Sequence, residues 1–152
     1  MLAASRFDSA DVACEAAAAA LGLMFALAVA PACFRLVPAE HAGRLFRRLS
    51  RVLLGSAALL ALAAAAMQIQ RIENWHGFAA DAAAFIILGI GLTALRPFER
   101  ARDRALREPG PGAAVDGAAT LRSHALLRGI RALAFVASAL LIAGAIATRN
   151  TF

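Results

Sequence analysis

Residues 12–34 read VACEAAAAALGLMFALAVAPACF, and the only charged residue in this stretch is Glu15. A helix of about 20 residues crosses a hydrocarbon core about 30 Å thick. Three more apolar stretches of similar length follow at about 52–69, 77–95 and 132–148. The sequence therefore predicts an all-α integral membrane protein, a four-helix transmembrane bundle that forms a single domain over residues 1–152.

The composition excludes an ordinary water-soluble domain. Hydrophobic residues make up 61% of the chain, and the mean hydropathy is +0.69. A soluble domain of this length could not cover so much apolar surface with polar side chains. A lipid bilayer is therefore the expected solvent and the first expected partner.

The segments between the apolar stretches are rich in arginine. Residues 39–51 place apolar side chains on one helical face and arginines mostly on the others, after Pro38 at a favourable first position. This pattern predicts a short amphipathic cytoplasmic helix on the membrane surface, leading into the second span. Residues 96–108 predict a charged helical extension of the third span, and the PGPG sequence at 109–112 predicts a break after it.

The distribution of arginine predicts the orientation. All 16 basic residues are arginines, five within residues 34–51 and eight within 96–131. Positive charge gathers on the cytoplasmic side of membrane proteins, so both segments are expected there. The absence of lysine suggests a GC-rich bacterial genome. We therefore predict a multi-pass protein of the bacterial inner membrane with both termini on the periplasmic side. The positive-inside pattern explains the formal charge of +6, and no nucleic-acid partner is expected.

The beginning of the chain carries two cysteines but no convincing signal peptide. Arg6 is offset by Asp8 and Asp11, so no net positive region precedes the first apolar stretch, which is expected to remain as a membrane anchor. In one helix, Cys14 and Cys33 would lie roughly 28 Å apart. A disulfide needs Cα atoms within about 7 Å, so these cysteines are expected not to pair.

Small residues recur every fourth position in three of the stretches. Such stripes let helix backbones approach closely in lipid, either within one bundle or against another membrane-protein subunit. The sequence does not decide between packing within the bundle and packing against another subunit. The stripes are Gly22, Ala26 and Ala30; Ala57, Ala61 and Ala65; and Ala139 and Ala143.

Four polar residues are expected on the outer side of the membrane. Glu15, Gln68, His76 and Asp81 lie near the outer ends of the predicted spans and form a possible outer cluster. Ionisable groups within a bilayer are often functional, and such a cluster could bind a cation or a proton. In the alternative interpretation, Glu15 and Asp81 occupy the first turns of their helices, where the helix dipole favours a carboxylate.

A second possible cluster lies on the cytoplasmic side and consists of Glu40, His41, Arg122 and His124. Interfacial polar residues are the alternative interpretation. A haem site would need histidines at matching depth on facing helices, whereas the third histidine, His76, lies at the opposite edge. The sequence contains no recognisable catalytic, cofactor or metal motif, so we expect no cofactor and no enzyme activity.

Four short motifs stand at the ends of the predicted spans: AVAPACFRL at 28–36, AGRLF at 42–46, RPFE at 96–99 and SHALL at 123–127. Together they resemble the transmembrane protein 205-like family, whose bacterial members form a membrane domain of unknown function. The resemblance implies a four-helix membrane protein of undefined biochemistry. Members of this family often carry an asparagine in the last helix, and here Arg131 lies near that position.

Three functions remain open from the sequence. The leading hypothesis is a small non-enzymatic accessory or structural subunit of a larger membrane complex, with the small-residue faces binding other subunits. The alternatives are a small-molecule or cation transporter or exporter, and a haem- or copper-handling membrane protein. Anionic lipid head groups are expected at the arginine-rich face in each case.

Overall fold

The computed structural model describes the backbone of residues 2–36, 39–69, 75–107 and 117–150. Side chains are described for residues 10–33, 35–36, 45–69, 75–94 and 125–147. The elements are α1 (Leu2–Met24), the π-helical segment η1 (Phe25–Val29), α2 (Ala30–Arg35), α3 (Ala39–Ile69), α4 (Trp75–Arg107) and α5 (Gly117–Asn150). The described residues contain no strand, in agreement with the predicted all-α class.

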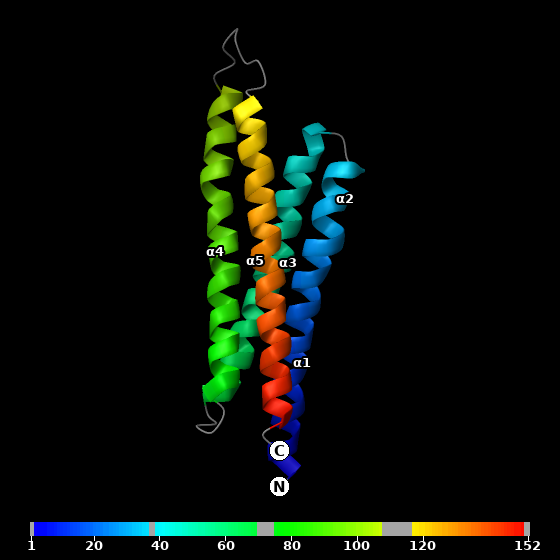
Figure 1. Ribbon diagram of the computed structural model, residues 1–152, viewed down its shortest axis with the longest axis vertical. Coiled ribbons are helices and arrows are strands. Elements are labelled where there is room, and N and C mark those ends of the chain that lie inside the picture. Colours follow the sequence, from blue (N-terminus) through cyan, green and yellow to red (C-terminus); the bar gives the residue numbers. More distant parts are fainter. Residues whose placement is uncertain (1, 37–38, 70–74, 108–116, 151–152) are drawn as a thin grey trace.

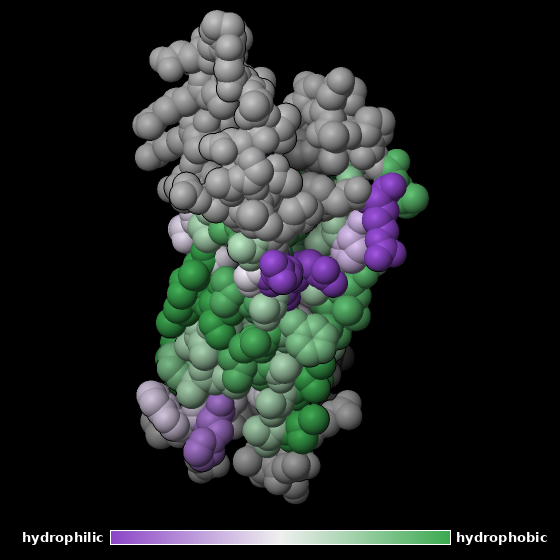
Figure 2. Space-filling view, turned by 45° about the horizontal axis from the view of Figure 1, so that its top comes forward, coloured by the Kyte–Doolittle hydropathy of each residue, from purple (hydrophilic) through white to green (hydrophobic). Residues whose placement is uncertain are grey.

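Four helical segments are long and apolar enough to cross a membrane: Ala10–Cys33, Leu45–Ile69, Trp75–Ala94 and Ala125–Ala147. Their number and order agree with the four predicted spans. Large apolar side chains on all four are exposed on the outside of the bundle, among them Leu27, Leu59, Ile86 and Phe135. Figure 2 shows hydrophobic side chains as a band around the middle of the visible face.

The helices form an elongated bundle in which α1 and α4 lie on opposite corners. The α1 helix packs against α3 and α5, and α4 packs against the same two helices. Figure 1 shows the start of α1 and the end of α5 at one end of the bundle. At the other end lie the end of α2, the start of α3, the end of α4 and the start of α5. The helix ends that border the two arginine-rich connections therefore lie at the same end of the bundle.

The inside of the bundle is built mainly from small side chains. Gly22, Ala26 and Ala30 are buried on the first span, and Ala57, Ala61 and Ala65 are buried on α3. These two stripes serve packing within the bundle, where close backbone approach gives the dispersion contacts that favour helix association in lipid. Ala139 and Ala143, by contrast, are exposed on the outside of α5.

The amphipathic segment is not a separate helix. Residues 39–51 are the first turns of α3 and continue into the second span without interruption. The buried Phe46 packs its ring against Phe25 of η1, with ring centroids 5.6 Å apart. The helix is continuous because the sequence between the two parts contains no proline that would end it. At Phe46, the apolar face of this segment packs against the first span.

Several helices extend beyond the predicted spans. The α4 helix continues to Arg107, as predicted for the charged extension, and α5 begins at Gly117. The predicted break at 109–112 lies outside the described residues. Cys14 and Cys33 are both free thiols, as their separation predicts.

Candidate functional site

Four polar side chains from three helices are buried near the end of the bundle where the chain begins and ends. Asp11, Glu15 and Asp81 are 0% exposed and Gln68 is 1% exposed. Asp11 and Glu15 lie one turn apart on α1, Gln68 lies near the end of α3, and Asp81 lies in the second turn of α4. We call these four residues the carboxyl cluster.

The Glu15 carboxyl lies at the centre of the carboxyl cluster. The Gln68 side-chain amide donates a 2.7 Å hydrogen bond from Nε2 to Glu15 Oε1. The Asp81 carboxyl also interacts directly with that of Glu15, although their helices occupy opposite corners of the bundle. Among the described residues, the second Glu15 oxygen and both Asp81 oxygens accept no hydrogen bond from a protein donor.

A glycine of α5 packs closely against this meeting of carboxyls. A Cβ atom at Gly144 of α5 would lie 3.4 Å from Asp81 Oδ1 and 3.7 Å from Glu15 Oε1. It would also lie 3.3 Å from the Ala80 Cβ, which is a tight contact. All four long helices therefore meet at this point, and α5 contributes backbone instead of a side chain.

The predicted placement of the two acidic residues in first helical turns is wrong. The α1 helix begins at Leu2, so Glu15 lies in its interior, and Asp81 lies six residues after the start of α4. The favourable effect of a helix N-terminus fades within the first turn. Both side chains are completely buried in the bundle, so the stabilising effect of a helix N-terminus does not account for them.

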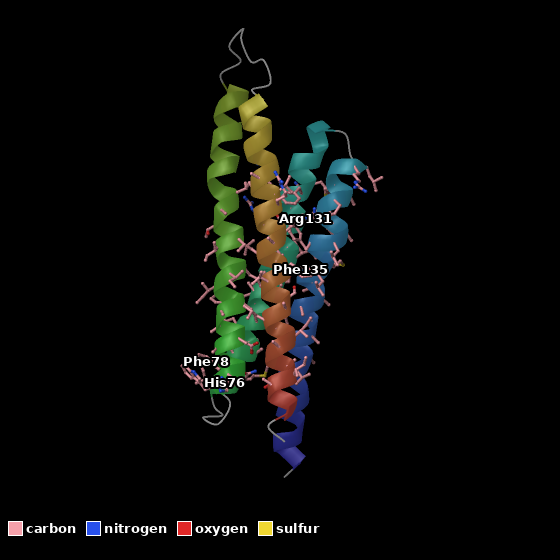
Figure 3. The ribbon with its side chains drawn as sticks, viewed as in Figure 1. His76, Phe78, Arg131 and Phe135 are labelled. Carbon is pink, nitrogen blue, oxygen red and sulfur yellow. The ribbon has the colours of Figure 1, made fainter. Side chains whose placement is uncertain are left out.

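The structure does not bring all of the predicted outer residues together. His76 is exposed near the start of α4 (Figure 3), whereas the side chains of the carboxyl cluster are buried. Asp11 joins the carboxyl cluster although it precedes the predicted first span. The side chains of Glu40, His41, Arg122 and His124, the possible cytoplasmic cluster, lie outside the described residues.

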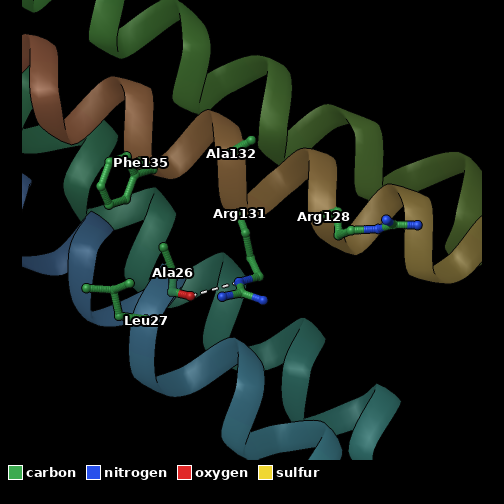
Figure 4. A pocket seen from close by; sticks show the side chains of 6 residues that line it. All are labelled: Ala26, Leu27, Arg128, Arg131, Ala132 and Phe135. Carbon is green, nitrogen blue, oxygen red and sulfur yellow. Dashed lines mark hydrogen bonds between the residues drawn. The ribbon is translucent and has the colours of Figure 1, made fainter.

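A second unusual feature lies in the other half of the first span. In η1, the Ala30 N–H donates to the Phe25 carbonyl, five residues back, as in a π-helix. The next carbonyl, that of Ala26, would need the N–H of residue 31 to continue this pattern, but Pro31 has none. The Nε–H of Arg131 on α5 donates to the Ala26 carbonyl instead, over 2.9 Å (Figure 4).

Comparisons of the chain with protein-family models, curated proteins and solved structures give no match. The resemblance to the transmembrane protein 205-like family therefore stays a prediction that rests on the four sequence motifs. The candidate function has to be argued from the carboxyl cluster itself.

Proposed function

We propose that this protein is a small multi-pass membrane transport protein that binds and releases a proton at the carboxyl cluster. The observation that carries this proposal is the contact between the buried Glu15 and Asp81 carboxyls, made across the diagonal of the bundle. Structural polar residues in membrane bundles usually pair with donors, whereas ionisable residues facing the inside of a bundle mark ion and proton pathways.

The chemistry of the pair favours occupancy by a positive species. Ionised carboxylates accept hydrogen bonds but donate none. Two ionised carboxylates in contact repel each other strongly where the dielectric constant is low. A proton between the Glu15 and Asp81 oxygens converts this repulsion into a hydrogen bond, and the Gln68 amide stabilises the accepting side.

A proton fits the pair better than a metal ion. Mg²⁺ and Ca²⁺ require six or more oxygen ligands around one point. Within the described parts of the chain, no three His, Cys, Asp or Glu side chains are placed to share a metal ion. The contact across the diagonal instead joins two carboxyls, and one shared proton would turn this contact into a hydrogen bond.

Two measurements on purified protein test the proton site and the transport function. In infrared spectra, we expect a protonated-carboxyl band that shifts in deuterium oxide and is lost in Glu15→Gln and Asp81→Asn. In proteoliposomes with an imposed pH gradient, we expect wild-type protein to dissipate the gradient and both variants to slow this at least about tenfold, equivalent to about 1.4 kcal/mol.

The matched control is His76→Gln, which alters an exposed polar residue at the same end of the bundle. We expect it to retain both the infrared band and the wild-type rate. The proposal would be contradicted if wild-type protein had no protonated-carboxyl band. It would also be contradicted if the pH gradient dissipated equally fast in vesicles with wild-type protein, with a variant and without protein.

The orientation that we propose places the carboxyl cluster toward the periplasm of a bacterial inner membrane. The two segments that carry 13 of the 16 arginines join helix ends at one end of the bundle, which supports a cytoplasmic position for that end. Both termini then lie on the periplasmic side. A C-terminal reporter that is active only in the cytoplasm would contradict this orientation.

An accessory subunit is the second candidate, and one observation favours it. Ala139 and Ala143 form an exposed small-residue stripe on α5, whereas the stripes on the first span and α3 are buried. Such a stripe suits close packing against a helix of a larger complex.

We expect the double variant Ala139→Leu/Ala143→Leu to lose co-purifying membrane proteins in mild detergent, because the added side chains hold a partner helix away. Ala63→Leu, at an exposed alanine on α3, should retain them. Quantitative mass spectrometry of the purified samples measures the difference. A wild-type monomer that purifies alone would argue against this candidate.

A further inference from the structure

We propose that the groove between η1 and α5 binds an anionic phospholipid, with the phosphate at its arginine end and the upper acyl chain at its apolar end. The groove has a volume of about 210 Å³. Figure 4 shows the side chains that line it: Ala26, Leu27, Arg128, Arg131, Ala132 and Phe135. It lies in the opposite half of the bundle from the carboxyl cluster and is independent of the proton proposal.

The arginine end offers a preorganised site for an anion. The hydrogen bond from Arg131 Nε to the Ala26 carbonyl holds this guanidinium in place. The two terminal nitrogens of the group remain as donors, and guanidinium groups bind phosphate in a bidentate manner. Arg128 is exposed one turn earlier on α5, at the rim of the same groove. The Arg131 guanidinium lies at the groove, whereas the Arg128 side chain lines its rim and extends along α5 away from Arg131 (Figure 4).

The opposite end of the groove is apolar. Leu27 is 62% exposed and Phe135 is 51% exposed, so both present large hydrophobic surfaces next to the arginines. Phe135 lies two turns after Arg128 on α5, which is roughly 10 Å along the helix. Figure 3 shows Phe135 nearer the middle of the bundle than Arg131. A phospholipid in the arginine-side leaflet has the same order, with its phosphate outward and its hydrocarbon inward.

The size of the groove favours a lipid over an enclosed substrate. Sites that enclose small molecules usually have volumes of about 300–1,000 Å³. A groove of about 210 Å³ holds only part of a molecule, and the rest of a phospholipid stays in the bilayer. A soluble phosphate would bind the arginines but would gain nothing from the exposed Leu27 and Phe135.

The position of the arginines supports the same occupant. Arg128 and Arg131 both lie within the apolar segment Ala125–Ala147, near its start. A cationic side chain at this depth is costly in hydrocarbon and is stabilised where it reaches an anionic head group. Phosphatidylglycerol supplies this negative charge, whereas phosphatidylcholine carries no net charge.

Native mass spectrometry of the full-length protein in detergent, titrated with phosphatidylglycerol or phosphatidylcholine, tests the proposal. We expect wild-type protein to retain phosphatidylglycerol preferentially and Arg128→Gln to weaken this binding about fivefold. Ala132→Leu fills the groove without removing a charge, and we expect a similar loss. Inorganic phosphate alone should not displace the lipid.

Two control variants make the same changes in charge and in bulk outside the groove. Arg48→Gln removes an exposed arginine of α3 outside the groove, and Ala63→Leu adds the same bulk on an outward face of α3. Both should bind phosphatidylglycerol as wild type does. Equal retention of the two lipids, an equal loss in Arg48→Gln and Arg128→Gln, unchanged binding in Ala132→Leu, or displacement by inorganic phosphate would each overturn the proposal.

Discussion

Replacement of Gly22 by leucine is expected to lower the free energy of unfolding by roughly 1–3 kcal/mol. Gly22 is buried on α1 where this helix contacts α5. A Cβ atom there would clash with the Ser138 hydroxyl oxygen and would lie 3.3 Å from the Ala134 carbonyl oxygen. The Ser138 hydroxyl already donates a 2.9 Å hydrogen bond to that same carbonyl, so it cannot turn away without losing this bond.

Reversible denaturation in mixed micelles measures this effect. Gly55→Leu is the matched control, because a Cβ atom at Gly55 of α3 would meet nothing within 4 Å. We expect the control to keep or slightly raise stability, since glycine is a poor residue for a helix interior. An equal loss of stability in both variants would show that close packing of α1 against α5 does not depend on Gly22.

Replacement of Arg131 by leucine is expected to destabilise the bundle by roughly 1–3 kcal/mol, because it removes the donor to the Ala26 carbonyl. Ala26 is only 2% exposed, so water cannot readily replace the lost bond. Arg128→Leu is the control, since it removes a similar charge from an exposed position on the same helix. Denaturation in mixed micelles again provides the measurement.

A double-mutant cycle with Pro31→Ala identifies the cause of this loss. Alanine at position 31 restores a backbone N–H near the Ala26 carbonyl. In that background, the effect of Arg131→Leu should shrink by about 1 kcal/mol, within the range seen for coupled neighbours. If the effects of the two substitutions add without coupling, the arginine stabilises the bundle for another reason.

The four spans could be predicted from the sequence because length and hydropathy decide whether a helix can cross a bilayer. Hydropathy alone does not set the helix ends, although the charged extension of the third span was predicted. Arginine, glutamate and alanine are all good helix formers, so a helix continues into charged sequence that hydropathy assigns to a connection. This explains why residues 39–51 begin α3 and why α4 extends to Arg107.

The carboxyl cluster could be predicted only in part from the sequence. Glu15, Gln68 and Asp81 were expected on one side of the membrane, and the structure brings them into one buried site. Asp11 was missed, although its spacing of four residues from Glu15 places both on one helical face. Gly144 carries no such signal, because its role depends on how α5 packs against α1 and α4.

The response of the first span to Pro31 was also only partly predictable. A proline within a helix indicates a local distortion, but the sequence alone does not choose between a kink and a π-helical turn. The donor that pairs with the Ala26 carbonyl comes from a distant helix, and Arg131 is 105 residues away from Ala26 along the chain. No local pattern contains that information.

The contribution of Gly144 has a consequence for biosynthesis. The acidic residues of α1 leave the ribosome first, whereas the backbone surface that completes their enclosure belongs to the last helix of the chain. An aspartate at the centre of a transmembrane helix costs about 2.5–3.5 kcal/mol on insertion scales, and a smaller cost applies near the end of a span, where Asp11 and Glu15 lie. The first helix is therefore at its least stable in lipid during synthesis, and an insertion machinery that holds it until α5 emerges would protect the nascent chain from degradation.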